Sequence, residues 1–174
     1  MSRQEISAPA VIDLYNAWND LGITTWIDGG WGVDALLGNQ SRPHRDLDIA
    51  VNYSDVPRLR QMMMARGYRE IQHDDTSEWN FVLRNDLGHT VDVHAFVNGA
   101  DGKVEKGIMY PAGSLTGTGK INDTVVRCIE AKHMIKFHTG YSLRETDYKD
   151  VLALCERFGI DVPPEYQDTK RTSE

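Results

Sequence analysis

The sequence predicts an α+β fold, in which helices flank a small mixed sheet and a short helical part ends the chain. Three observations support this. Strand-like segments at residues 79–83 and 90–96 are separated by a turn at 85–88, helical periodicity occurs near both ends, and a strand of alternating pattern starts at Asp46. Because strands joined by hairpins run antiparallel, we expect a mixed, largely antiparallel sheet.

Length and composition narrow the class of protein. The chain has 174 residues, with 19 basic and 26 acidic side chains and a formal net charge of −7. This length suits one folding unit, and the negative charge disfavours a nucleic-acid partner. The first residues lack the apolar stretch of a signal peptide, and no apolar run is long enough to cross a bilayer. We therefore expect a cytoplasmic protein without a membrane partner.

The first predicted element is a helix over residues 11–21. Its apolar residues recur at helical spacing, Ser7 and Pro9 are start signals, and Gly22 is a stop signal. A strand over residues 24–27 follows, because β-branched and aromatic residues are concentrated there.

A tight turn at Asp28, Gly29 and Gly30 leads into a second helix that begins near Trp31. The next strand, residues 46–51, alternates apolar side chains with polar or small ones, which predicts one packed face and one face carrying carboxylates.

The middle of the chain continues with a helix at about 55–66 and a strand at 68–71, before the two strands at 79–83 and 90–96. Residues 113–129 are rich in turn-forming residues, and we expect irregular structure up to a hairpin that closes near Asn122 and Asp123.

Two helices are predicted at the end, one near 131–139 and one that starts at Ser142, where Glu145 three residues later matches a capping box. The buried face of this last helix is predicted from Val151, Leu152, Cys155 and Phe158. The polar tail after Pro163 is expected to fray. We divide the chain into a core, residues 1–129, and a C-terminal helical segment, residues 130–174, which packs on the core within the same folding unit.

Two carboxylates on one strand are the first functional signal. Asp46 and Asp48 are two residues apart, so their side chains share a face. Such a pair repels itself unless positive charge intervenes, and Mg²⁺ prefers carboxylate and triphosphate oxygens. The alternative is a solvated polar face of an edge strand.

A second strand favours the metal interpretation, because Thr90, Asp92 and His94 share one face. Asp92 would complete a three-carboxylate cluster, and such a cluster can hold two metal ions about 4 Å apart for in-line displacement at phosphorus. Asp92 is also a candidate acceptor for the proton of an incoming hydroxyl. His94 either orients Asp92 or is a hydrogen-bonded core histidine.

Phosphate-binding residues are expected beside these carboxylates. Gly29 and Gly30 precede a helix, so a phosphate can approach backbone N–H groups at its positive end. His44 and Arg45 directly precede Asp46 and are candidates for contacts with phosphate oxygens, although ordinary surface charge is an alternative for both.

Other sites are disfavoured. Residues 117–120 suggest a P-loop, but Ser114 stands where the motif needs glycine and Ile121 where it needs serine or threonine. The histidines lack zinc-ligand spacing, and Cys128 and Cys155 are expected to be structural thiols.

The order of these motifs resembles the antibiotic nucleotidyltransferases of the polymerase-beta-like superfamily: Gly29-Gly30, then residues 44–48 (His-Arg-Asp-Leu-Asp), then a strand with Asp92. Residues 26–34 are similar to the lincosamide nucleotidyltransferases and, less closely, to the aminoglycoside 2''-nucleotidyltransferases. Residues 137–141 and 145–147 also look like the lincosamide enzymes. The resemblance covers about 24–155.

The resemblance implies a nucleotidyltransferase fold and transfer of AMP from Mg-ATP to a hydroxyl of a small cationic antibiotic. It implies that Asp46, Asp48 and Asp92 bind metal and perform the chemistry, and that Gly29 and Gly30 face the triphosphate.

One departure concerns Trp31. Many superfamily members have serine at this position, whereas this chain resembles the lincosamide branch in having tryptophan. Backbone N–H groups, or His44 and Arg45, are expected to replace the missing hydroxyl, and Lys132 and Lys136 are further candidates for positive charge.

Two alternatives remain open at this stage. One is nucleotide transfer to a protein hydroxyl, which predicts a wide acceptor groove. The other is a binding module of the same fold that binds nucleotide or drug without turnover. The sequence leaves the natural acceptor and the oligomeric state undetermined.

Overall fold

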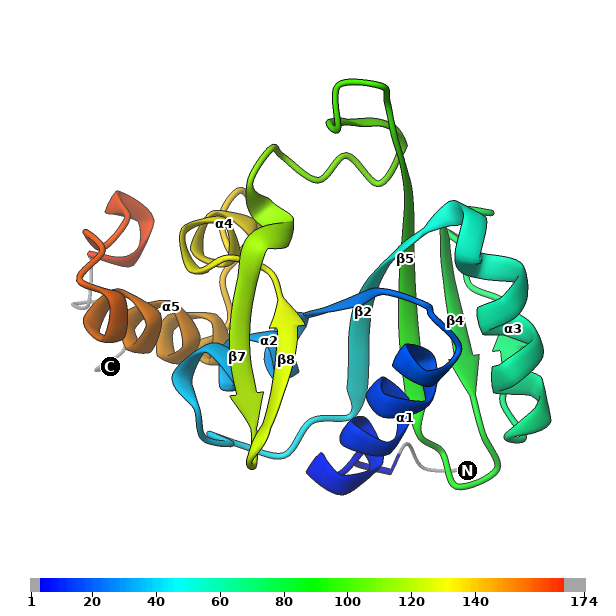
Figure 1. The fold of residues 1–174 in the computed structure, drawn as a ribbon. Helices are drawn as coiled ribbons and strands as arrows, with labels where there is room; N and C mark the ends of the chain where they lie inside the picture. The colour runs from blue at the N-terminus through cyan, green and yellow to red at the C-terminus, as the bar shows by residue number, and fades with distance from the viewer. Residues whose placement is uncertain (1–3, 168–174) are drawn as a thin grey trace.

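The computed structural model describes residues 4–167, and within them eight strands form one sheet (Figure 1). The strand order is β3-β4-β5-β2-β1-β8-β7, and β6 pairs with β5. The strands are β1 (Thr25–Asp28), β2 (Asp46–Asn52), β3 (Arg69–Ile71), β4 (Asn80–Arg84), β5 (Thr90–Asn98), β6 (Val104–Gly107), β7 (Gly117–Ile121) and β8 (Thr124–Cys128).

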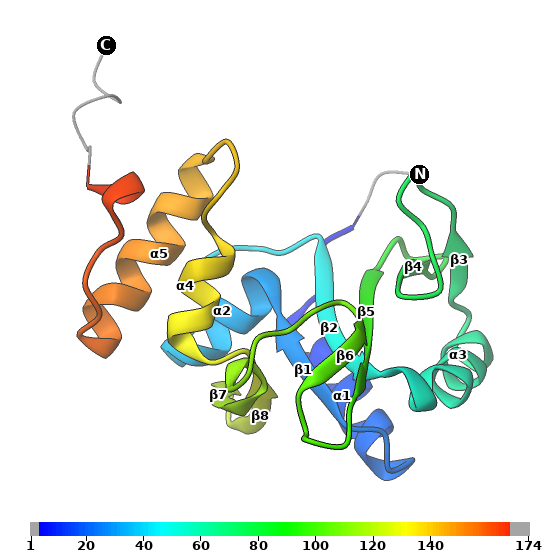
Figure 2. The ribbon, with the colours of Figure 1, turned by 90° about the horizontal axis from the view of Figure 1, so that it is seen from above.

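Helices cover both faces of this sheet. Figure 2 shows α1 and α3 on one face, and α2 with α4 and α5 on the other. The α-helices are α1 (Ala8–Asp20), α2 (Gly29–Leu37), α3 (Val56–Ala65), α4 (Ala131–Phe137) and α5 (Glu145–Phe158), and short 3-10 turns occur at Tyr53–Asp55, Ser114–Thr116 and Pro164–Tyr166. None of the helices in the described part is long and apolar enough to cross a membrane.

The sheet is mixed and largely antiparallel, as predicted. Strands β2 and β5 pair in parallel, as do β1 and β8, whereas the other neighbouring strands pair antiparallel. The parallel β2–β5 pair lies at the centre, and it fixes the positions of the predicted carboxylates.

The core forms where the apolar faces of the strands meet the helices. Leu47, Ile49 and Val91 are fully buried, and Trp18 on α1 is also fully buried. The alternation that predicted β2 is therefore real, since its apolar side chains enter the core and its carboxylates face the other side. Burial of this apolar surface is the main source of stability.

The region before the Asn122 turn differs from the prediction of irregular structure, because residues 117–121 form the regular strand β7. Its glycines reflect close packing: a Cβ at Gly119 would overlap the carbonyl of Ala35 on α2, and one at Gly117 would lie 2.7 Å from the carbonyl oxygen of Cys128. These glycines let α2 and β8 approach the β7 backbone, which explains a glycine pattern without a phosphate site.

The start of α5 also differs from the prediction. The helix begins at Glu145, and the carboxylate of Asp147 accepts a hydrogen bond from the backbone N–H of Arg144 at 2.7 Å. The predicted capping box from Ser142 to Glu145 is therefore wrong. The observed capping box is two residues further along the chain, between Arg144 and Asp147.

The buried face of α5 was only partly predicted. Val151 and Cys155 are buried as expected, but Phe158 is 40% exposed and Leu154 takes the central position. The segment after Pro163 continues into an ordered turn, in which buried Tyr166 donates a hydrogen bond to the carbonyl of His138; the predicted frayed tail beyond residue 167 lies outside the described residues.

The C-terminal helices contact the rest of the chain through α2, because both α4 and α5 pack against it. The division at residue 129 stays a prediction. The two cysteines are buried free thiols, as expected.

Candidate active site

Three adjacent strands bring carboxylates together on one face of the sheet. Asp48 on β2 is the register partner of Asp92 on β5 and, on its other side, of Asp28 on β1. Asp46 lies two residues before Asp48 on the same strand face. We call Asp28, Asp46, Asp48 and Asp92 the carboxylate cluster. The three predicted aspartates are thus neighbours, and the structure adds Asp28.

Two members of the carboxylate cluster, Asp48 and Asp92, lie in surroundings that disfavour their ionised form. Burial raises the pKa of Asp48 well above its usual value, and the negative charges of Asp28, Asp92 and Asp46 raise it further. Burial also raises the pKa of Asp92, and Asp46 adds to this effect, while His94 opposes it. Like charges without a fixed counter-charge favour a site that receives a cation.

Asp28 connects the carboxylate cluster to the start of α2. Its Oδ1 accepts a hydrogen bond from the backbone N–H of Gly29 at 2.8 Å and so caps the helix. Its Oδ2 accepts a hydrogen bond from the hydroxyl of Tyr110 at 3.2 Å. Burial and the charge of Asp28 raise the pKa of Tyr110, so this hydroxyl remains a donor.

The two glycines at this turn are required by close approach. Gly29 has a φ of +58°, and a Cβ there would overlap the carboxylate of Asp48. A Cβ at Gly30 would lie 2.5 Å from Nδ1 of His44. Trp31 is 1% exposed, and its ring centroid lies 4.9 Å from that of His44, so it is a core residue.

A cleft of about 560 Å³ opens beside this turn, which we call the arginine cleft. Gly30 and Asp46 line one side, and Arg42, Arg45 and Arg144 supply positive charge. The N-terminal end of α2 thus faces a space lined by guanidinium groups, an arrangement that suits an anion with several oxygen atoms.

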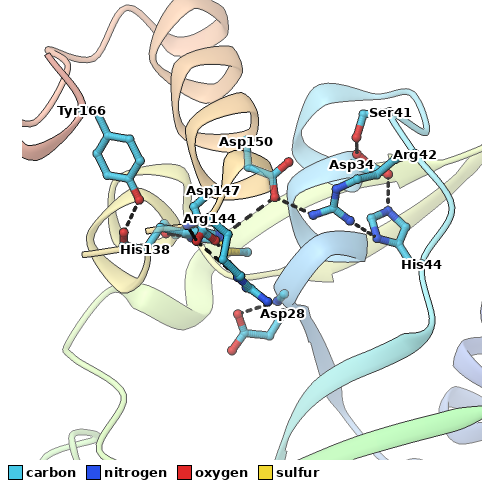
Figure 3. Close-up of polar contacts among 12 residues, drawn as sticks. Asp28, Asp34, Ser41, Arg42, His44, His138, Arg144, Asp147, Asp150 and Tyr166 are labelled. Atoms are coloured by element: carbon cyan, nitrogen blue, oxygen red, sulfur yellow. Dashed lines mark hydrogen bonds and ion pairs between the residues drawn. The ribbon is translucent and has the colours of Figure 1, made fainter. Parts of the chain in front are cut away.

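Arg42 and His44 of this cleft belong to a network of paired polar side chains with Asp34, Ser41 and Asp150, which we call the arginine–histidine network (Figure 3). His44 Nε2 lies 2.5 Å from Oδ2 of Asp34, and its Nδ1 lies 2.7 Å from Nη1 of Arg42. Because a guanidinium can only donate, Nδ1 accepts, and the ring carries its proton on Nε2 toward Asp34. Ser41 donates to the other oxygen of Asp34 at 2.6 Å, and Asp150 on α5 accepts from Nη2 of Arg42 at 2.8 Å.

Two smaller clefts border the carboxylate cluster, one at Asp46 and Asp92 and the other at Asp28. One, of about 290 Å³, is polar and includes Asp46, Asp75 and Asp92; we call it the Asp92 cleft. The other, of about 230 Å³, has an apolar wall of Ile108, Met109, Tyr110 and Phe137, and we call it the apolar cleft. His94 lines both of them, and its Nδ1 is buried without a hydrogen-bond partner among the described residues.

The site can hold a metal ion only if water or phosphate oxygens supply ligands in addition to the protein's carboxylates. Among residues 4–167, no three histidine, cysteine, aspartate or glutamate side chains are arranged to hold a metal ion by themselves. The predicted three-carboxylate cluster is therefore not a ready-made metal cage in the protein alone. Mg²⁺ usually takes one or two carboxylates and completes its shell with water and phosphate oxygens, and Asp46 and Asp48 beside the arginine cleft fit that pattern.

The remaining predicted phosphate ligands lie in different settings. Arg45 is exposed and lines the arginine cleft. His44 also lines it but is buried, with both ring nitrogens engaged, so phosphate binding would require it to release a partner. Lys132 and Lys136 are exposed on α4 and are not among the described residues that line the three clefts. Nucleotide binding by these four residues stays a prediction.

Sequence reasoning missed Asp28, Arg42, Asp34 and Asp150. Asp28 carried a usable signal, since it stands at a strand end directly before Gly29 and therefore caps the next helix. Arg42 and Asp150 are 108 residues apart, so their pairing had no local signal.

Comparisons with known proteins give a consistent result. The family model described as aminoglycoside-2''-adenylyltransferase matches residues 10–154. A lincosamide resistance protein of Staphylococcus haemolyticus is 28% identical over 156 residues, covering 87% of this chain and 96% of that protein.

Solved structures agree in fold. The crystal structure of a lincosamide antibiotic adenylyltransferase with bound lincomycin has a TM-score of 0.75 and 26% identity, over 87% of this chain and 98% of that one. The crystal structure of ANT(2'')-Ia in complex with adenylyl-2''-tobramycin has a TM-score of 0.72 and 21% identity, over 86% and 87% of the two chains.

Proposed function

Because the chain belongs to the aminoglycoside-2''-adenylyltransferase family, whose members compared above are antibiotic nucleotidyltransferases, we propose that it transfers AMP from ATP to a hydroxyl of a lincosamide antibiotic. The observation that carries this proposal is the register of β1, β2 and β5, which sets Asp28, Asp48 and Asp92 side by side. These carboxylates lie next to a cleft lined by arginines.

The triphosphate is assigned to the arginine cleft. Gly30 leaves room beside the N-terminal end of α2, and Arg42 and Arg45 offer guanidinium donors to phosphate oxygens. Asp46 lines this cleft and also the Asp92 cleft. ATP and the antibiotic that accepts the nucleotide would therefore meet at the carboxylate cluster.

Asp46 and Asp48 would hold the divalent metal, with Mg²⁺ as the expected ion and Asp92 as a further ligand if two ions bind. When bound, the metal neutralises triphosphate charge and stabilises the oxygens that attack and leave. The like charges around Asp48 support this role, because a cation relieves the repulsion that raises its pKa.

The transfer step uses Asp92 as the proton acceptor. The acceptor hydroxyl loses its proton to Asp92 while its oxygen forms a bond to the α-phosphorus of ATP. The bond from that phosphorus to the oxygen bridging to the β-phosphorus breaks, and pyrophosphate leaves. Asp92 lines the Asp92 cleft and is not among the described residues that line the arginine cleft, which supports its assignment to the acceptor side.

The acceptor is assigned to the Asp92 cleft together with the apolar cleft. A lincosamide combines a sugar with hydroxyl groups, a basic amine and an alkyl-substituted ring. Asp75 and Asp92 suit the amine, and Met109 and Phe137 suit the apolar part. His94 borders both clefts, so its buried, unpartnered nitrogen is placed to bond an acceptor group.

An aminoglycoside is the second candidate acceptor, favoured by the acidic character of the Asp92 cleft. An aminoglycoside is polar throughout and leaves the apolar cleft without a matching group. For this reason the lincosamide assignment stands first.

The test is pyrophosphate release from Mg-ATP with lincomycin, clindamycin, kanamycin or tobramycin, with Asp48→Asn as the inactive control. We expect release with the two lincosamides, absent in the variant, and a product heavier by one AMP group in mass spectrometry. Release only with kanamycin or tobramycin would transfer the assignment to aminoglycosides.

Silence with all four drugs would contradict the drug-modifying proposal. Self-labelling or labelling of an added protein by α-labelled ATP would then identify transfer to a protein hydroxyl. Binding of ATP without any labelling would identify a non-catalytic module.

A further inference from the structure

Arg42 is the fixed cation of the arginine cleft. Its Nη1 donates to His44 and its Nη2 donates to Asp150, at 2.7 and 2.8 Å. The side chain of Arg42 is 30% exposed, whereas that of Asp150 is only 6% exposed. Arg42 thus presents part of its surface to the cleft, and Figure 3 shows the carboxylate of Asp150 at its guanidinium group.

Asp150 reaches Arg42 from a distant part of the chain. It lies on α5, which packs against α2, while Arg42 lies in the segment between α2 and β2. Asp150 is not among the described residues that line the arginine cleft. Its hydrogen bond to Arg42 is the contact that connects Asp150 to the lining of this cleft.

The other partners leave Arg42 little freedom. His44 accepts from Arg42 while its own N–H points to Asp34, and Asp34 is held in turn by Ser41. The guanidinium is therefore fixed from two directions, by His44 and by Asp150. An arginine that is already ordered loses less side-chain freedom when it binds phosphate than a free one.

We propose that Asp150 is a positioning residue, which orients the guanidinium of Arg42 toward the phosphates of the bound nucleotide and so links α5 to nucleotide affinity. The inference rests on the proposed function, because it takes the arginine cleft as the triphosphate site. A purely structural role for Asp150 would instead affect stability and leave nucleotide affinity unchanged.

The experiment measures binding of ATP with MgCl₂ by calorimetry, without any acceptor, to the full-length protein and its variants. We expect Asp150→Asn to weaken ATP binding about 10- to 100-fold, the range for loss of a hydrogen bond to a charged group. Asp150→Glu keeps the charge and is expected to restore part of the affinity. Adenosine, which has no phosphate, should bind both proteins equally.

A matched control separates positioning from loss of packing. Leu154→Ala removes a fully buried side chain on the same helix but no hydrogen bond of Arg42. We expect this variant to melt at a lower temperature and to bind ATP within twofold of the parent. In steady state, Asp150→Asn should raise KM for ATP while leaving KM for the acceptor unchanged.

Coupling between the two residues gives the decisive comparison. If Asp150 acts through Arg42, Arg42→Ala with Asp150→Asn should bind ATP no more weakly than Arg42→Ala alone. Additive losses, or unchanged ATP affinity in Asp150→Asn, would overturn the inference while leaving the proposed function intact. Failure of the parent protein to bind ATP would overturn both.

Discussion

The carboxylate cluster and the arginine–histidine network are adjacent, and each contains buried or half-buried aspartates, but they treat negative charge differently. In the network, Asp150 faces Arg42 and Asp34 faces His44 at hydrogen-bond distance. In the cluster, the charges of the other aspartates add to burial in raising the pKa of Asp48, whereas burial also raises the pKa of Asp150 but the charge of Arg42 opposes that rise. Paired carboxylates hold a fold together, whereas unpaired ones in a cleft indicate a site that awaits a cation.

This difference predicts opposite behaviour on neutralisation. Removing a charge from the network should reduce stability and affect the reaction only indirectly. Removing the charge of Asp46 or Asp48 from the cluster should greatly reduce the reaction rate without reducing stability. The predictions below test this contrast.

The largest effect is expected for Asp46→Asn. If Asp46 holds the metal as we propose, loss of its charge removes several kcal/mol of transition-state stabilisation, so kcat/KM for AMP transfer should fall by about 10³-fold or more. Asp20→Asn, which neutralises an exposed aspartate at the end of α1, is the matched control and should retain full activity. Substantial activity in a folded Asp46→Asn protein would contradict the assignment of this residue.

A smaller loss is expected for Asp92→Asn. A general base contributes about 10²- to 10⁴-fold to a rate, so kcat should fall by about this factor while the affinity for Mg-ATP is largely retained. Single-turnover kinetics and equilibrium ATP binding separate the two quantities. Equal loss of both would show that Asp92 acts chiefly as a metal ligand.

Asp34→Asn tests the network. Asparagine removes the charge that strengthens the hydrogen bonds from His44 and Ser41, and its NH₂ group cannot accept from either. We expect the free energy of unfolding to fall by about 1–3 kcal/mol in urea titrations. Lys149→Ala, which breaks an exposed ion pair with Glu145 on α5, should change it by less than about 0.5 kcal/mol.

The smallest effect concerns the pH dependence of Asp48 in the absence of metal. Its pKa is raised in the folded chain, so ionising it costs more in the folded state than in the unfolded state, and stability falls as pH rises above the usual carboxyl range. Asp48→Asn should therefore stabilise the protein at pH 7 by on the order of 1 kcal/mol. This gain should shrink as the pH is lowered toward 4, and unfolding curves with EDTA at both pH values check it.

Much of the fold followed from local pattern. Alternation along residues 46–51 identified β2 and its two faces, and the same rule placed Asp92 and His94 together on β5. Glycine-rich β7 was missed because its pattern reflects close packing of α2, which depends on residues far away in the sequence.

The site was predictable to the extent that its residues share a strand. Asp46 and Asp48 needed only the two-residue period, and the same period on the second strand suggested Asp92 as the third carboxylate, which the resemblance to a known family also implied. His44 shows the limit, because its partner Asp34 lies on α2 and its partner Arg42 is bonded in turn by Asp150 on the distant helix α5. Local pattern cannot distinguish a buried histidine that supports an arginine from one that contacts phosphate.

The central claim is that buried aspartates of the two regions differ in whether their charge is compensated. The most direct test is a paired measurement of the free energy of unfolding of Asp48→Asn and Asp34→Asn at pH 7 with EDTA. We predict that Asp48→Asn is at least as stable as the parent protein and that Asp34→Asn is less stable. A loss of stability in Asp48→Asn equal to that in Asp34→Asn would contradict the account, because Asp48 would then be a structural residue like Asp34.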